Sequence, residues 1–118
     1  MNIEQIREYC LGKPAATEGF PFGDATLVFK VGGKIFALLF LENSWLNLKC
    51  DPDKAIELRE RFAAVVAPYH MHKKLWNTIL PDSATPDRLI REWIDDSYDL
   101  VVAKLTRAQR RLVMSSGK

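Results

Sequence analysis

A glycine pair in the first third of the chain constrains the fold most strongly. Two strand-like runs, Thr26–Val31 and Lys34–Leu41, are separated only by Gly32-Gly33. A two-residue loop of this composition favours a type I′ hairpin, because both of its residues must adopt positive φ. The loop pairs Val31 with Lys34, so the chain is expected to contain an antiparallel sheet.

Side chains of the hairpin alternate between the two faces of the sheet. With Phe29 opposite Phe36, the core face is predicted to carry Leu27, Phe29, Phe36, Leu38 and Phe40. The opposite face is then predicted to carry Val28, Lys30, Ile35, Ala37 and Leu39.

A third strand is expected over Trp45–Cys50, in one of two registers. A two-residue loop would place Trp45 opposite Phe40, whereas a three-residue loop would place Leu46 there. The second register keeps one face apolar throughout, as a half-buried sheet requires, so it is the one that we expect. The opposite face of this strand then carries Trp45, Asn47 and Lys49, beside Ala37, Leu39 and Leu41.

Helices are expected before and after these strands in the sequence. The first covers residues 3–11, the second begins at Asp51-Pro52, and the third runs from Thr85 to about Leu105. The second and third each start with an N-cap residue followed by proline. The basic tail beyond residue 105 is expected to be a frayed, solvated end.

The segment Glu18–Gly23 is expected to be a loop, because glycine and proline punctuate it. Its two phenylalanines, Phe20 and Phe22, are expected to pack on the core as a plug between helix and sheet. The alternative is that they form the rim of a site.

Residues 68–80 combine histidines, lysines and large aromatic side chains. Lys73 and Lys74 break any helical apolar period, so the pattern indicates a strand up to about His70, a tight basic turn, and a second strand from Trp76. Cations beside flat rings suit an anionic partner with phosphates or stackable bases. A solvated turn whose Trp76 packs into the core is the simpler interpretation of the same residues.

The complete order is helix, three strands, helix, two strands, helix. It predicts the α+β class, with an antiparallel sheet and helices packed on one face, in a single domain over residues 1–118.

Composition limits the possible classes of function but does not identify one. The 118 residues carry a net charge of +2, from 17 basic and 15 acidic side chains, so only local clusters of charge can attract an anionic partner. No run approaches the length of a membrane span, and the N-terminus lacks a secretory pattern, so we expect a cytoplasmic protein. Cys10 and Cys50 are predicted to be buried free thiols.

No pattern indicates a catalytic nucleophile, a metal centre or a cofactor site. Neither cysteine has a histidine near it in sequence, and no Gly-x-Ser-x-Gly motif is present. His70 and His72 would share a strand face, but a third metal ligand is not close by. We therefore expect a binding protein without a cofactor, not an enzyme.

Several segments follow one another in the order and at the spacing of a known family. They are Phe20–Gly23, Val28–Leu38, Leu46–Pro52, Tyr69–Thr78 and Ser97-Tyr98. Together they resemble the MmcQ/YjbR family. The resemblance implies a CyaY-like fold and a cytoplasmic, bacterial, non-enzymatic DNA-binding protein with a double-wing motif. His72 departs from the pattern, because the family commonly has a small polar residue there. Frataxin-like relatives of the fold use an acidic surface for iron, and this chain has no matching acidic run.

The resemblance implies that the basic hairpin wings contact DNA. The predicted contact residues are His70, Lys73, Lys74, Trp76 and Asn77, with Lys30, Lys34 and Lys49. The alternative is a small anionic ligand or a protein on the mixed sheet face around Trp45, with Leu39, Asn47 and Lys49, and with the loop of Phe20 and Phe22 as a lid. The oligomeric state stays open.

Overall fold

A six-stranded antiparallel sheet organises the chain, in the strand order β1-β2-β3-β4-β6-β5. The computed structural model describes residues 1–68 and 71–115. The strands are β1 (Thr17–Gly19), β2 (Thr26–Val31), β3 (Lys34–Phe40), β4 (Trp45–Lys49), β5 (Val65–Val66) and β6 (Trp76–Ile79). The helices are α1 (Ile3–Leu11), α2 (Pro52–Arg61), α3 (Asp87–Ala103) and α4 (Arg107–Met114).

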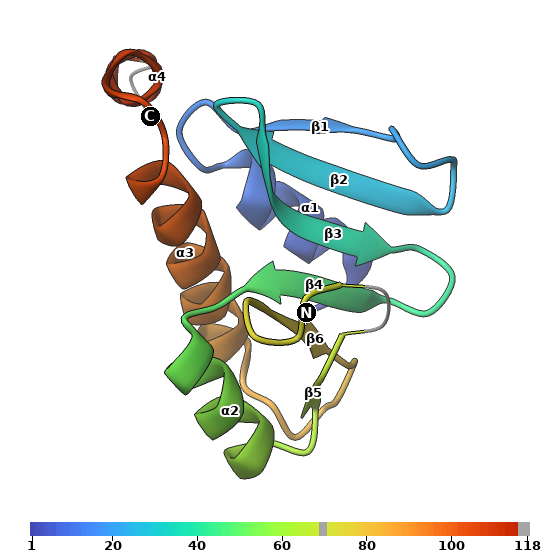
Figure 1. Ribbon diagram of the computed structural model, residues 1–118. Helices are drawn as coiled ribbons and strands as arrows, with labels where there is room; N and C mark the ends of the chain where they lie inside the picture. The colour runs from blue at the N-terminus through green and yellow to red at the C-terminus, as the bar shows by residue number, and fades with distance from the viewer. Residues whose placement is uncertain (69–70, 116–118) are drawn as a thin grey trace.

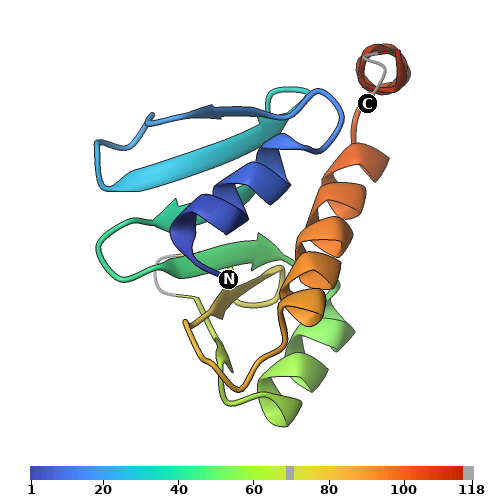
Figure 2. The ribbon, with the colours of Figure 1, turned by 180° about the vertical axis from the view of Figure 1, so that it is seen from behind.

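Helices α1 and α3 pack on one face of the sheet, and α2 lies beside β5 and β6 (Figures 1 and 2). Helix α4 lies beyond the end of α3 (Figure 1). The other face of the sheet, which we call the open face, is turned toward the viewer in Figure 1 and carries no helix within the described residues. The predicted α+β architecture is confirmed.

The Gly32-Gly33 turn forms as the sequence predicts. The two glycines have φ of 58° and 79°, and Val31 pairs with Lys34. Leu105, which follows α3, packs directly on this turn: a Cβ at Gly32 would lie 2.7 Å from Cδ2 of Leu105. Glycine is therefore required at Gly32 both by its backbone conformation and by the close approach of a core side chain.

A β-bulge interrupts β3 immediately after the hairpin tip. Lys30 pairs with Ile35, but Phe29 pairs with Ala37, so Phe36 is an extra residue without an opposite partner in β2. Phe36 and Ala37 are both fully buried and both belong to the core.

The bulge reverses the predicted faces for the rest of β3. Ala37 and Leu39 pack in the core, whereas Leu38 and Phe40 lie on the open face. The prediction was wrong for these four residues because it assumed an uninterrupted strand, and one inserted residue changes the phase of a period-two pattern.

The register of β4 also differs from the expected one. Trp45 pairs with Phe40 and Leu46 with Leu39, which is the register that the sequence analysis set aside. Leu46 stays in the core because the bulge has already shifted the phase of β3. Trp45, Asn47 and Lys49 lie on the open face as predicted, but beside Leu38 and Phe40 and not beside Leu39.

Two elements were missed. Residues 17–19 form β1, a short edge strand paired with β2, where a loop was predicted. The tail after Leu105 forms α4 instead of a frayed end, because Thr106 and Gln109 make a capping box and Val113 is buried in the core. The strand predicted to end near His70 is short, at Val65–Val66, and His70 itself lies outside the described residues.

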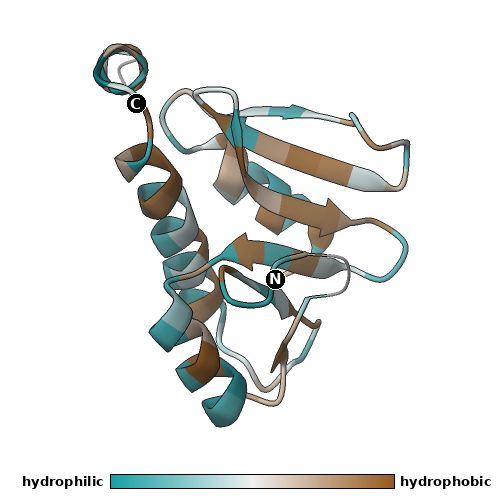
Figure 3. Cartoon of the chain, viewed as in Figure 1, coloured by the Kyte–Doolittle hydropathy of each residue, from teal (hydrophilic) through white to brown (hydrophobic). Residues whose placement is uncertain are grey.

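Hydrophobic residues run along most of β2 and β3, as Figure 3 shows. Several of their open-face side chains are also apolar, and Val28 and Leu38 are buried. Cys10 and Cys50 are buried free thiols, as predicted. None of the described helices is both long and apolar enough to cross a membrane.

We expect Gly32→Ala to destabilise the protein more than Gly33→Ala. Both substitutions force alanine into positive φ, at a cost of about 1 kcal/mol, but only the methyl group at Gly32 would meet Leu105. Urea unfolding should show a loss of about 2–4 kcal/mol for Gly32→Ala and about 1 kcal/mol for Gly33→Ala. Equal losses would contradict the packing of Leu105 on the turn.

Candidate functional site

The open face contains a hollow of about 600 Å³. This volume is within the range of about 300–1,000 Å³ that is usual for small-molecule sites. Its apolar lining comes from two central strands of the sheet and from two loops, and consists of Phe22, Ile35, Leu38, Phe40, Trp45 and Met71. We call this feature the open-face hollow.

 The strand residues among these belong to β3 and β4, and Thr26 of β2 and Thr78 of β6 border the same hollow.

Exposed aromatic side chains surround the hollow. Phe22 is 65% exposed and Trp45 is 40% exposed. The expected plug of Phe20 and Phe22 on the core is therefore wrong, and the alternative, a rim, describes Phe22. The neighbouring Phe20 is 50% exposed but does not line the hollow.

A pair of buried polar side chains forms part of the floor. Thr78 Oγ1 donates a hydrogen bond to Asn47 Oδ1 at 2.5 Å, and Asn47 Nδ2 donates to Met71 Sδ at 3.1 Å. Asn47 and Thr78 are almost completely buried. Met71 belongs to the segment between β5 and β6, which crosses in front of β4 in Figure 1. This segment therefore covers part of the open face and is positioned there by Asn47.

The lysines predicted to contact DNA do not all lie on the same face of the sheet. Lys30 and Lys49 point to the open face, since their strand neighbours belong to the core, whereas Lys34 shares the helix-covered face with its partner Val31. Lys73 and Lys74 are exposed in the turn before β6. Because β2 and β4 end where β3 and β6 begin, all of these lysines lie at one end of the sheet (Figure 1).

These lysines are not neutralised by acids of the described chain. The ion pairs found in residues 1–68 and 71–115 involve the amino terminus, Arg7, Lys13, Lys54 and Arg61. The end of the sheet that carries Lys49 and the turn of Lys73 therefore remains cationic.

The two predicted contact residues of β6 differ in accessibility. Trp76 pairs with Lys49 and points to the open face, where it is half-buried. Asn77 points the other way and is 2% exposed. Asn77 Nδ2 donates to the carbonyl oxygen of Ala55, and its Oδ1 accepts a hydrogen bond from Arg59. Asn77 therefore joins α2 to the sheet and is not available to a ligand in this conformation.

Arg59 is a residue that the sequence analysis did not single out. Its Nη1 donates to the carbonyl oxygen of Lys73 at 2.9 Å and to Asn77 Oδ1 at 2.8 Å. Arg59 thus holds the basic turn against α2. Its position next to the buried Leu58 in the sequence does not predict these contacts.

The structure also places the histidines and cysteines that the sequence analysis considered. His72 is exposed and its Nδ1 accepts a hydrogen bond from the backbone of Lys74, while His70 lies outside the described residues. Among the residues that the structure describes, no three histidine, cysteine or acidic side chains are grouped to hold a metal ion. Burial raises the pKa of the Cys10 thiol to about 12 and also raises that of Cys50, so neither is an activated thiolate.

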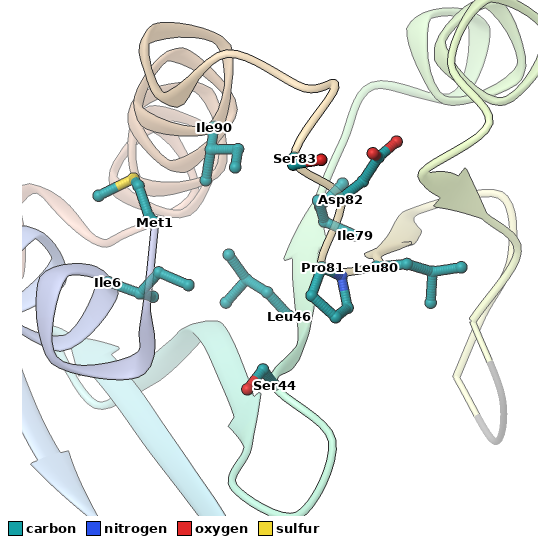
Figure 4. A pocket seen from close by; sticks show the side chains of 10 residues that line it. All are labelled: Met1, Ile6, Ser44, Leu46, Ile79, Leu80, Pro81, Asp82, Ser83 and Ile90. Carbon is teal, nitrogen blue, oxygen red and sulfur yellow. The ribbon is translucent and has the colours of Figure 1, made fainter.

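A second hollow of about 240 Å³ lies on the helix-covered side of the sheet. Figure 4 shows Ile6, Leu46 and Ile90 facing this space, with Asp82 and Ser83 at its border. Its apolar walls belong to the hydrophobic core. It is therefore a gap between packed elements, smaller than the open-face hollow and without an exposed aromatic side chain.

Comparison with known proteins identifies the family. Residues 11–100 match the family model described as YjbR. The chain belongs to the YjbR family. Its relatives in this family include the uncharacterised proteins YbdF of Escherichia coli O157:H7, with 34% identity over 93% of this chain and 92% of that protein, and YjbR of Escherichia coli K12, with 30% identity over 97% and 98%.

Solved structures show the same fold. A Deinococcus radiodurans protein with a DUF419 domain matches with a TM-score of 0.89 and 36% identity, over 96% of this chain and 88% of that one. A Pseudomonas syringae protein matches with a TM-score of 0.75 and 26% identity, over 85% and 98%. The YjbR family resemblance seen in the sequence is thereby confirmed.

We expect Arg59→Ala to destabilise the protein by about 1–3 kcal/mol, because it leaves the buried Oδ1 of Asn77 without its donor. Arg61→Ala is the matched control on the same helix, since Arg61 makes an exposed ion pair with Glu57 and lies over the ring of Phe62, and its loss should cost less than about 1 kcal/mol. Urea unfolding measures both. Hydrogen exchange should also quicken in the turn of Lys73 in the first variant alone, and an unchanged turn would refute its attachment through Arg59.

Proposed function

We propose that this YjbR-family protein is a non-enzymatic binding module whose ligand occupies the open-face hollow. The observation that carries the proposal is the placement of two exposed aromatic side chains, Phe22 and Trp45, around one apolar hollow. Large apolar side chains that gather on an exposed surface commonly mark a binding site.

The construction of the hollow supports this proposal. Its floor is formed by paired strands, which hold Leu38 and Phe40 in fixed positions, and its borders are formed by the two segments that carry Phe22 and Met71. A rigid floor with borders from longer loops is a common arrangement in ligand sites. The alternative function considered from the sequence, a surface around Trp45, is thus the one that the geometry favours most.

Nile red, an uncharged apolar dye, should bind to the folded protein and gain fluorescence. We expect Phe22→Ala to weaken this binding about tenfold, because it removes a large apolar side chain from the border. Phe20→Ala is the matched control, since Phe20 is similarly exposed but does not line the hollow. If the two variants bind the dye equally well, the hollow is not the site.

DNA is the second candidate ligand, and a different observation favours it. Lys30, Lys49, Lys73 and Lys74 lie at one end of the sheet without acidic partners in the described chain, and Trp76 lies beside Lys49. Lysines grouped around an aromatic side chain suit a phosphate backbone with bases next to it.

Binding to a DNA duplex at two salt concentrations tests this second candidate. The double substitution Lys73→Ala/Lys74→Ala should weaken binding at low salt and reduce the slope of log K against log salt by about two, because two phosphate contacts are lost. Arg88→Ala, an exposed cation on α3, is the control and should leave both quantities unchanged. Binding that is absent at low salt, or insensitive to the double substitution, would exclude the basic turn as a DNA site.

A further inference from the structure

We infer that the open-face hollow takes a small organic acid, with an aromatic body near Trp45 and its carboxylate between Asn47 and Lys49. This inference rests on the proposed binding function and adds the chemical class of the ligand. Three observations carry it: the order of side chains along β4, the hydrogen bonding of Asn47, and the distribution of charge around the face.

The open face of β4 presents an indole, an amide and an ammonium group in that order. Trp45, Asn47 and Lys49 alternate with core residues, so successive members are about 7 Å apart along the strand. The distance from Trp45 to a point between Asn47 and Lys49 is then about 10 Å. An aromatic ring joined to a carboxylate by about three carbons has this length.

Asn47 provides a hydrogen-bond donor that its own chain uses poorly. The amide is 1% exposed and Nδ2 donates to the sulfur of Met71, which is a weak acceptor. The other buried asparagine, Asn77, donates instead to a carbonyl oxygen. A carboxylate oxygen is a much stronger acceptor than a thioether, so a ligand that carries one can replace Met71 at this position.

Met71 is suited to such an exchange. Its side chain is unbranched and adapts to irregular surroundings, and it lies at the border of the open-face hollow. On arrival of the acid, the thioether can leave Asn47 and pack against the apolar body of the ligand. The residue that covers the donor in the free protein then becomes part of the wall of the site.

The charges at the two ends of the open face determine the orientation in which the acid is proposed to bind. Lys30 and Lys49 lie at the end where the carboxylate is placed, whereas Asp24 and Glu42 lie in the two loops at the end of Phe40 and Trp45. A carboxylate is attracted to the first end and repelled from the second. An amine of the same shape would be repelled from Lys49, so the site should distinguish acid from base.

Three compounds that share one body test the inference: 4-phenylbutyrate, 4-phenylbutanol and 4-phenylbutylamine. Calorimetric titration of the whole protein should give an affinity about tenfold higher for the acid than for the alcohol, with the amine weakest. Lys49→Gln should reduce the affinity for the acid to that for the alcohol and leave the alcohol unchanged. Lys34→Gln is the matched control on the helix-covered face and should change neither.

Proton NMR of the same samples gives a readout that charge alone would not move. The side-chain amide resonances of Asn47 and the methyl resonance of Met71 should shift with the acid and much less with the alcohol. Equal affinities for acid and alcohol, or an acid affinity that Lys49→Gln leaves intact, would overturn the inference while the hollow remains a binding site. If none of the three compounds binds to a protein that still binds Nile red, the inference is also overturned. If Nile red does not bind either, the proposed binding function is overturned as well.

Discussion

The hydroxyl group of Ser97 stabilises the bulged part of β3 at Phe36, on which the arrangement of the open face depends. Ser97 is fully buried on α3, where its Oγ donates to the carbonyl oxygen of Phe36 at 2.6 Å and accepts from the backbone N–H of Lys49 at 2.8 Å. These two backbone groups lie just beyond the Ala37–Leu48 pair, at which the β3–β4 ladder ends, and buried backbone groups must find partners. Phe36, whose carbonyl oxygen accepts from Ser97, is also the extra residue of the bulge between β2 and β3, and this bulge sets the phase of β3 so that Leu38 and Phe40 face the hollow.

Local sequence signals predicted much of the fold. Gly32-Gly33 specified the hairpin, Asp51-Pro52 specified the start of α2, and the alternation of Trp45, Asn47 and Lys49 gave their shared face. The bulge at Phe36 could not be found in the same way. The run from Phe36 to Phe40 is apolar at every position, so a period-two pattern contains no information about which residues face the helices.

The site itself was less predictable, because it is assembled from segments that are distant in the chain. Asn47 and Met71 are 24 positions apart, and their contact depends on how the segment before β6 crosses the sheet. The resemblance to the YjbR family identified Lys73 and Asn77 as candidates with equal weight. The packing of α2 distinguishes them. Arg59 contacts both residues, but the side chain of Lys73 stays exposed whereas that of Asn77 is buried.

The two strands at the margins of the sheet are its shortest: β1 spans Thr17–Gly19 and β5 spans Val65–Val66. At the first margin, the guanidinium of Arg7 makes two hydrogen bonds to the carboxylate of Glu18 and so fastens β1 to α1. Margins this brief offer few free backbone groups to an incoming chain. The sheet is consequently a poor template for growth into fibrils, even though its central strands are strongly hydrophobic.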